Sequence, residues 1–383
     1  MSAADHEFMA RALQLAARGL YSAHPNPRVG CVIVRDGEIV GEGWHARTGG
    51  PHAEVVALQQ AGGRARGATA YVTLEPCCHT GRTPPCTDAL LQAGVARVVA
   101  AMLDPNPQVA GNGMAQLAQA GVHAESGVLQ AQAEALNRGF ITRMEKKRPF
   151  VRCKLAMSLD GRTALANGAS RWITGDAARL DVQRLRAQSG AILTGVGTVL
   201  IDDPSLTVRA AELAAQGVEL NTDPSASSGQ VFAQPLRVVL DSQLRTPEYA
   251  RLLAAPGRAL IVTAATDAAR KERLLQKGAE IIAFPDQAQK VDVRAALHYL
   301  AARHEINDVL LEAGPTLSGA MLEAGLVDEL VIYIAPVLLG DAARGLFHLS
   351  HTLQTMQERI TLKVTEVRAV GRDWRVTVKP DVP

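Results

Sequence analysis

Several features that would indicate other classes of protein are scarce in this chain. Its 383 residues include only five cysteines, too few and too unevenly placed for a disulfide framework. We therefore expect the protein to be located in a reducing cytoplasm. Aromatic residues make up 4% and the net charge is +2, which does not suit a dedicated nucleic-acid binder. No apolar run reaches the roughly 18 residues of a membrane span. The charged N-terminus predicts an amphipathic helix and no signal peptide.

The glycine-rich fingerprint of dinucleotide-binding domains is also missing. No Gly-x-Gly-x-x-Gly follows the first strand pattern of the second half, and GVGTV at 195–199 lacks the third glycine. A standard nucleotide-binding argument therefore fails for this half of the chain.

The length predicts two domains, and both halves alternate strand and helix patterns, which indicates an α/β class. In the first half, Asp36-Gly37 between apolar runs predicts a hairpin. Residues 144–149, MEKKRP, are interpreted as a linker or as the start of a new domain, so we expect domains at 1–146 and 147–383. The last apolar–polar alternation, around Gly371, predicts a terminal hairpin. The polar stretch at about 210–235 predicts an exposed loop.

Three potential metal ligands occur near the start of the chain. His52 lies in PHAEVVAL, and Cys77 and Cys86 lie in LEPCCHTGRTPPC. One imidazole and two thiolates are three protein ligands, which leaves the fourth position of a tetrahedral zinc ion open, as in catalytic sites. Glu54, two residues after the histidine, is placed to carry protons. This combination predicts a zinc-dependent hydrolytic deaminase.

The loop between the cysteines is longer than the usual Cys-x-x-Cys spacing. It contains Arg82 next to a glycine, and we expect this guanidinium to meet a substrate phosphate. The alternative is a closed structural zinc site that takes Cys78 or His79 as its fourth ligand. Glu54 argues against it, because a structural site needs no proton carrier.

Other residues have two open interpretations. Asn26 in HPNPRVG is either a substrate contact or a turn residue, and His45 in GEGWH is either a substrate contact or a surface histidine. In the second half, Gly314-Pro315 after a strand predicts a helix start whose N–H groups suit a phosphate, or an ordinary turn.

Longer motifs add a resemblance to a known family. PNPRVGCVIV, AYVTLEPCCHTGRTPPC, DPNPQVAGNG, KLAMSLDGRTA and EAGPTLSGAMLEAGLVDEL resemble the bifunctional deaminase–reductases of bacterial riboflavin biosynthesis. The resemblance implies a cytidine-deaminase-like domain followed by a dihydrofolate-reductase-like domain. It also implies zinc and NADPH as cofactors, one phosphoribosylaminopyrimidine as the substrate of both domains, and a homodimer formed through the reductase domains.

The resemblance also implies site residues. In the first domain, His52, Cys77 and Cys86 match zinc ligands and Glu54 the proton carrier. The positions that match an NADPH site are Ala156, Trp172, Thr198, Asp202, Ser242, Gly314, Pro315, Thr316, Leu317, Ser318, Gly319 and Ala320. The positions that match the substrate side of the reductase are Ser170, Arg186, Leu206, Arg209 and Glu312.

Chemistry suggests roles for some of these residues. Arg186 and Arg209 suit a phosphate because a guanidinium binds one bidentately. Lys154 in KLAMSLDG is either the acid that protonates the opening sugar or a surface lysine.

Two departures from the family pattern stand out: Cys78 occupies a position that is commonly serine, and the polar insertion at 221–234 is longer than usual. Two alternative functions are a nucleoside or RNA deaminase fused to a pteridine-type reductase, and a non-catalytic zinc-stabilised binding module.

Overall fold

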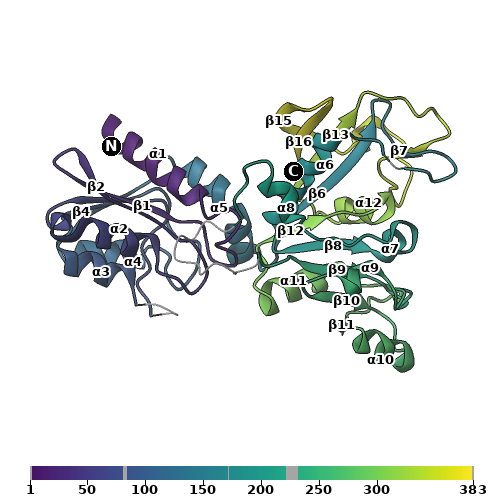
Figure 1. Ribbon diagram of the computed structural model, residues 1–383, viewed down its shortest axis with the longest axis horizontal. Helices are drawn as coiled ribbons and strands as arrows, with labels where there is room; N and C mark the ends of the chain where they lie inside the picture. Colours follow the sequence, from purple (N-terminus) through teal and green to yellow (C-terminus); the bar gives the residue numbers. More distant parts are fainter. Residues whose placement is uncertain (1, 81–83, 171, 221–231, 382–383) are drawn as a thin grey trace. The chain divides into compact units, whose positions relative to one another are not determined.

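The computed structural model describes residues 2–80, 84–170, 172–220 and 232–381 (Figure 1). The chain forms two compact units. The first comprises Met1–Lys147 with Glu219–Phe232, and the second comprises Arg148–Val218 with Ala233–Pro383. Each unit is built on a sheet covered by helices, so the α/β class expected from the sequence is confirmed. Among the described residues, no helix is long and apolar enough to cross a membrane.

The first unit contains a five-stranded sheet in the order β2-β1-β3-β4-β5. Its strands are β1 (Gly30–Arg35), β2 (Glu38–Trp44), β3 (Thr69–Val72), β4 (Arg97–Ala100) and β5 (His123–Ser126). Strand β1 is antiparallel to both neighbours, whereas β3, β4 and β5 run parallel. The predicted hairpin joins β1 to β2, and Asp36 and Gly37 both have positive φ, as a two-residue turn of this kind requires.

Helices cover both faces of this sheet. They are α1 (Ala3–Ala17), α2 (Ala53–Ala61), α3 (Cys86–Ala93), α4 (Asn112–Gln119) and α5 (Gln130–Lys146), with a 3-10 turn η1 (Gly62–Ala65) after α2. Alternate residues of β1 point to opposite faces. Val32 and Val34 therefore join a core with α1 and α5, while Cys31 and Ile33 join a second core with α2, α3 and α4.

Two glycines let α2 lie directly against β2. A Cβ atom at Gly41 would stand 2.1 Å from the carbonyl oxygen of Ala57, and one at Gly43 would stand 2.3 Å from that of Ala53. Any side chain there would push the helix away from the sheet. The glycines of GEGWH therefore set the position of α2, and with it the position of His52 and Glu54 at its start.

The second unit contains a nine-stranded sheet in the order β11-β10-β9-β8-β12-β6-β13-β16-β15. In this order, every strand from β11 through β10, β9, β8, β12 and β6 to β13 runs parallel to its neighbours. Strands β16 and β15, which form a C-terminal hairpin, then continue the sheet in antiparallel pairing. Its strands are β6 (Phe150–Ser158), β8 (Ala191–Gly195), β9 (Leu236–Leu240), β10 (Ala259–Thr263), β11 (Ala279–Ala283), β12 (Asp308–Leu311), β13 (Glu329–Ala335), β15 (Leu362–Val370) and β16 (Asp373–Pro380). A separate small pair joins β7 (Arg162–Ala164) to β14 (Arg344–Gly345).

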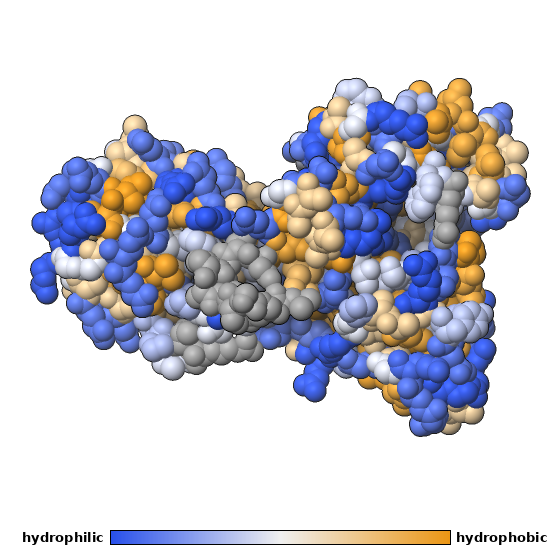
Figure 2. Space-filling model, viewed as in Figure 1, coloured by the Kyte–Doolittle hydropathy of each residue, from blue (hydrophilic) through white to orange (hydrophobic). Residues whose placement is uncertain are grey.

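Helices again lie on both faces of the large sheet (Figure 1). They are α6 (Asp176–Ala187), α7 (Val196–Asp202), α8 (Ala210–Ala214), α9 (Arg251–Ala254), α10 (Ala268–Gln276), α11 (Val293–Arg303) and α12 (Pro315–Glu323), with a 3-10 turn η2 (Met356–Glu358). Helices α11 and α12 share the largest core with one face, and α6, α7, α9 and α10 pack on the other. Figure 2 shows that hydrophilic side chains cover much of the face in view.

Most sequence-predicted elements are present. The terminal hairpin around Gly371 is confirmed. The apolar run GAILTGVGTVL spans two elements, because β8 ends at Gly195 and α7 begins at Val196. The interpretation of residues 144–146 as part of a linker is wrong, because α5 continues to Lys146. The expected loop begins with α8, and most of the polar insertion at 221–234 lies outside the described residues.

Replacing Gly43 by alanine tests the close packing of α2 on β2. The added methyl group meets the backbone of Ala53, so we expect the first unit to lose about 1–3 kcal/mol of unfolding free energy, as in other overpacked cores. Urea denaturation followed by circular dichroism measures this loss. Gly63→Ala is the matched control, because no heavy atom lies within 4 Å of its Cβ position. Equal stability of the two variants would contradict the packing argument.

Candidate metal centre and reductase site

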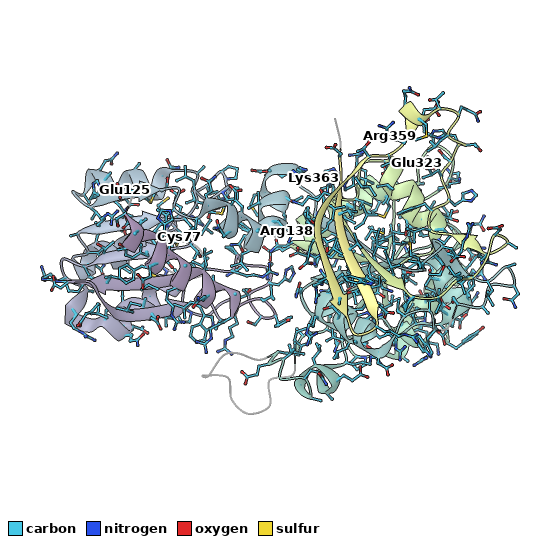
Figure 3. All side chains as sticks on the ribbon, turned by 90° about the horizontal axis from the view of Figure 1, so that it is seen from above. Cys77, Glu125, Arg138, Glu323, Arg359 and Lys363 are labelled. Atoms are coloured by element: carbon cyan, nitrogen blue, oxygen red, sulfur yellow. The ribbon has the colours of Figure 1, made fainter. Side chains whose placement is uncertain are left out.

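The structure brings His52, Cys77 and Cys86 together from three segments of the first unit. His52 is the N-cap of α2, Cys86 is the first residue of α3, and Cys77 lies in the loop after β3 (Figure 3). Their ligand atoms all lie within 4.8 Å of one another. His52 Nδ1 is 3.2 Å from the Cys86 sulfur and 3.6 Å from the Cys77 sulfur.

These distances suit a zinc ion. Zinc binds nitrogen at about 2.0 Å and sulfur at about 2.3 Å in a tetrahedron, which separates the two ligand atoms by about 3.5 Å. The ligand set also has the charge that a cation needs. The Cys86 thiol and the His52 imidazole lower the pKa of Cys77 to about 4, and the Cys77 thiolate in turn raises the pKa of Cys86. Without a metal, the opposite pKa shifts favour one thiolate and one thiol in this pair. A divalent cation stabilises both thiolates, because coordinating thiols lose their protons.

Glu54 lies in the first turn of α2 and is 3% exposed. Burial raises the pKa of its carboxyl group, while the nearby His52 lowers it. A carboxyl group that is held away from water beside three ligands takes up and returns a proton more readily than an exposed one. The position of Glu54 therefore suits the predicted proton carrier.

His45 is 3% exposed, so it is not a surface histidine. Its Nδ1 lies 3.0 Å from the carbonyl oxygen of Pro51, which only accepts, so Nδ1 donates. Its Nε2 accepts from the Asn26 side-chain amide at 2.9 Å. The ring also packs edge-on against His52, with centroids 5.4 Å apart. Asn26 and His45 thus form a hydrogen-bonded chain that ends at the residue before His52.

The remaining residues of the cysteine loop are separate from this cluster. Cys78 is half-buried and not part of the ligand group, and its sulfur lies 4.0 Å from the carbonyl oxygen of Gln108. Burial raises the pKa of the Cys78 thiol, which opposes the thiolate form that a metal binds. The predicted phosphate contact Arg82 lies outside the described residues.

In the second unit, the residues expected around NADPH lie where neighbouring parallel strands end. Thr198 and Asp202 are on α7 after β8, Ser242 follows β9, and Gly314 follows β12. Strands β9, β8, β12 and β6 are consecutive in the sheet, so these loops share one edge. Ligands of open parallel sheets bind beside the carboxyl ends of the strands.

Lys154, Glu312 and Arg186 form a charged group at this edge. Leu311 pairs with Cys153, so Glu312 follows β12 beside Lys154 of β6. Arg186 of α6 donates to both oxygens of Glu312, at 2.6 and 2.9 Å, and to the carbonyl oxygen of Thr207 at 2.9 Å. Burial lowers the pKa of the Lys154 ammonium; Glu312 opposes this and the charge of Arg186 adds to it. Lys154 is therefore not a surface lysine.

The segment after β12 behaves as the sequence predicts. Pro315 is the first residue of α12, and Gly314 is its N-cap without a side-chain bond. Gly314, Thr316 and Ala320 are exposed, whereas Ser318 and Gly319 are buried. A Cβ atom at Gly319 would stand 2.2 Å from the carbonyl oxygen of His348, so this glycine allows close packing.

The other predicted residues differ in exposure. Trp172 is 69% exposed, with the Arg179 guanidinium 4.6 Å from its ring centroid. Arg209 is exposed and pairs with Glu212 at 2.8 Å. Leu206 is buried, with 2% of its surface exposed, and its backbone has a positive φ of 50°. Ser170 and Ala156 are partly exposed, the latter on β6.

Sequence reasoning missed two pairings. The Arg186–Glu312 ion pair joins residues 126 positions apart, and Asn26 and His45 are 19 positions apart. Neither spacing is a recognisable motif. Sequence reasoning also missed Glu75, which immediately precedes Pro76-Cys77. The available signal was an acidic residue two positions before a metal ligand.

The two sites together define a two-domain enzyme, with a zinc-type deaminase domain before a reductase domain. Residues 2–102 match the family described as cytidine and deoxycytidylate deaminase zinc-binding region, and residues 149–376 match the RibD C-terminal domain. The chain is 52% identical to the riboflavin biosynthesis protein RibD of Escherichia coli, over 96% of this chain and 97% of the relative. The chain therefore belongs to the RibD family.

Solved structures support the same family assignment. A RibD structure from Acinetobacter baumannii is 44% identical, covers 99% of both chains and has a TM-score of 0.87. A diaminohydroxyphosphoribosylaminopyrimidine deaminase/5-amino-6-(5-phosphoribosylamino)uracil reductase from Thermotoga maritima is 34% identical, with a TM-score of 0.82 over 98% of this chain and 99% of its own. Both the fold class and the deaminase–reductase class expected from the sequence are confirmed.

Replacing individual cysteines tests which sulfurs bind the metal. We expect Cys77→Ser to lose most bound zinc and Cys78→Ser to keep the wild-type amount. Of these two adjacent cysteines, Cys77 belongs to the ligand cluster with His52 and Cys86, and Cys78 does not. Elemental analysis of the purified variants gives the zinc content per chain. Loss of zinc in Cys78→Ser with retention in Cys77→Ser would show that the adjacent sulfur is the ligand.

Proposed function

We propose that this chain catalyses two consecutive reactions of riboflavin biosynthesis on one phosphoribosylated pyrimidine. The first hydrolyses the 2-amino group of 2,5-diamino-6-(5-phosphoribosylamino)pyrimidin-4(3H)-one to give 5-amino-6-(5-phosphoribosylamino)uracil. The second reduces the ribosyl group to ribityl with NADPH. The observation that carries the proposal is the His52–Cys77–Cys86 cluster with buried Glu54, in one chain with the reductase domain of the RibD family.

In the deaminase domain, His52, Cys77 and Cys86 would hold zinc, which would lower the pKa of a coordinated water and so supply a nucleophile at neutral pH. Glu54 accepts a proton from the attacking water and delivers protons to the ring nitrogen and to the departing amine. The C2–N bond then breaks, ammonia leaves and a carbonyl forms. This division of labour is general in zinc-dependent base deaminases. His45 and Asn26 hold the segment before His52, and Asn26 and Arg82 are the proposed substrate contacts.

In the reductase domain, bound NADPH would supply the hydride that C1′ of the ribose takes up. The C1′–O4′ bond breaks, and O4′ must take up a proton as the sugar opens. We assign this proton to Lys154, because its lowered pKa makes it a better acid than an exposed lysine. Glu312 keeps the ammonium group charged, and Arg186 holds Glu312 in place through its two hydrogen bonds.

The remaining roles are the ones that the family resemblance implies. The exposed guanidinium of Arg209 suits the 5-phosphate, and Arg186, Ser170 and Leu206 complete the proposed substrate side. The cofactor-facing set is Ala156, Trp172, Thr198, Asp202, Ser242, Gly314, Pro315, Thr316, Leu317, Ser318, Gly319 and Ala320. Within this set, buried Ser318 and Gly319 shape the helix start, and exposed Gly314 and Thr316 present its N–H groups. Domain boundaries near 146 and 147 and a reducing cytoplasmic location, which suits two thiolate ligands, complete the proposal.

The proposed homodimer has a candidate surface on the C-terminal hairpin. Val364 and Val367 of edge strand β15 pair with Val378 and Val376 of β16, which belong to or pack on the largest core, so all four point to one sheet face. Val364 and Val367 are nevertheless 57% and 55% exposed, and Trp374 on the same face is 52% exposed. An apolar edge strand invites pairing with a second copy.

The mass of the protein in solution tests this assembly. The chain weighs 40.6 kDa, and light scattering should give about twice that mass. Val367→Lys places a charge on the proposed surface and should shift the protein toward the monomer mass. Tyr249→Lys, at a residue 85% exposed elsewhere in the second unit, is the control and should stay dimeric. A monomeric wild-type protein would contradict the proposal.

Two separate measurements on the diaminopyrimidine substrate test the reaction sequence. The wild-type enzyme should release ammonia first and then oxidise NADPH, with little oxidation of NADH. Glu54→Gln should keep zinc but lower ammonia release by about 10²–10⁴-fold, because the proton carrier is lost. Ammonia release at the wild-type rate in this variant would refute the assignment of Glu54.

Lys154→Gln provides the reciprocal variant in the same assay. It should release ammonia normally and oxidise NADPH at least 10²-fold more slowly, because no acid protonates O4′. The wild-type reductase rate should also fall with rising pH below the usual lysine pKa of about 10.4, since a lowered pKa loses the acid earlier. Full NADPH oxidation by Lys154→Gln would move the acid to another group.

A further inference from the structure

Glu75 is a buried carboxylate bound by backbone groups. It is 3% exposed and follows β3, two residues before Cys77. Its Oε2 accepts from the N–H groups of Asp104 at 3.0 Å and Gly111 at 2.9 Å. Its Oε1 accepts from Gly113 at 2.9 Å and Met114 at 3.2 Å. One side chain thus binds four backbone donors from residues 104–114, the segment that contains the DPNPQVAGNG motif.

Three of these donors are at the start of α4. Gly111 is the N-cap of this helix and has no side chain with which to cap it. Glu75 supplies the missing acceptor from 36 positions earlier in the chain. It takes the N–H groups of the second and third helical residues, which a local cap would bind, and its negative charge lies at the positive end of the helix. Glu75 therefore fixes α4 against the end of β3.

The same contact reaches the metal-binding loop. A Cβ atom at Gly113 would stand 2.1 Å from the carbonyl oxygen of Pro76, so the first turn of α4 lies directly on the residue before Cys77. Cys77 also contacts the start of α3. Its carbonyl oxygen accepts from the Thr87 N–H at 3.2 Å, and its sulfur accepts from the Cys86 N–H at 3.3 Å. Cys77 is thereby held between the starts of α3 and α4.

We propose that Glu75 is a positioning residue for the metal ligand Cys77, acting through the start of α4. This inference rests on the proposed zinc site. The Glu75 carboxylate lies at the end of a buried strand and is bound there by four backbone N–H groups. These contacts give the DPNPQVAGNG segment a role, because its backbone forms the donors that bind Glu75.

The substitution Glu75→Gln separates this role from simple burial. The side chain keeps its size, but one oxygen becomes an NH₂ group that faces two backbone N–H donors and can accept from neither. The start of α4 must then shift, and Pro76 and Cys77 with it. Glu75→Asp keeps both oxygens on a shorter side chain and should have a smaller effect. Glu145→Gln, at an exposed acidic residue of the same unit, is the matched control.

The readout is the metal site itself. Chelator competition measures zinc affinity, and the absorption of the Co²⁺-substituted protein reports the geometry of the cobalt–thiolate bonds. We expect Glu75→Gln to weaken zinc binding at least tenfold and to shift the cobalt–thiolate bands. Ammonia release at saturating zinc should fall. NADPH oxidation by the second domain, measured with 5-amino-6-(5-phosphoribosylamino)uracil supplied directly, should stay unchanged. Glu145→Gln should match the wild type in every measurement.

The outcomes distinguish this inference from the proposed function. A wild-type protein that binds neither zinc nor Co²⁺ would contradict the zinc site. A folded Glu75→Gln variant with wild-type zinc affinity and cobalt spectrum would overturn the positioning role and leave the zinc site standing. If circular dichroism shows that Glu75→Gln does not fold, Glu75→Asp decides in the same assays: unchanged affinity and spectrum overturn the inference, and weaker binding with shifted bands supports it.

Discussion

The first unit depends on bringing one imidazole and two thiols to a common point. Each comes from the start of a helix or from the loop before one, and none of these segments places a ligand by itself. His52 depends on the packing of α2 against Gly41 and Gly43 and on the His45–Pro51 hydrogen bond. The sulfur atoms lie close enough to compete for a proton, which makes their environment favourable for a cation.

A comparable constraint operates in the second unit with a different result. Lys154, Glu312 and Arg186 gather where parallel strands end, and burial makes their charges interdependent. Removing any one would leave the others partly buried without full compensation. Burial lowers the pKa of the Lys154 ammonium group and Glu312 opposes that shift, whereas in the first unit the grouped thiols and imidazole suit a cation.

Much of this was accessible from the sequence because it is encoded locally. Asp36-Gly37 specifies a tight turn, Pro315 a helix start, and the His52–Glu54 and Cys77–Cys86 spacings a metal-site pattern. The domain-scale resemblance rests on long motifs of the same local kind. An ambiguous local pattern misled at residues 144–146, which were polar enough for a linker but form the end of α5.

The sequence by itself therefore determined the residue types, the α/β class and the ligand candidates, because these depend on spacings of a few residues. Only the tertiary structure decided which pairs act together. It separated Cys78 from the metal cluster, placed Arg186 on Glu312, buried His45 between Asn26 and Pro51, and set Glu75 as the cap of a helix 36 positions later. Such partners lie far apart in the chain, and only the packing of helices on the sheet brings them within hydrogen-bonding distance.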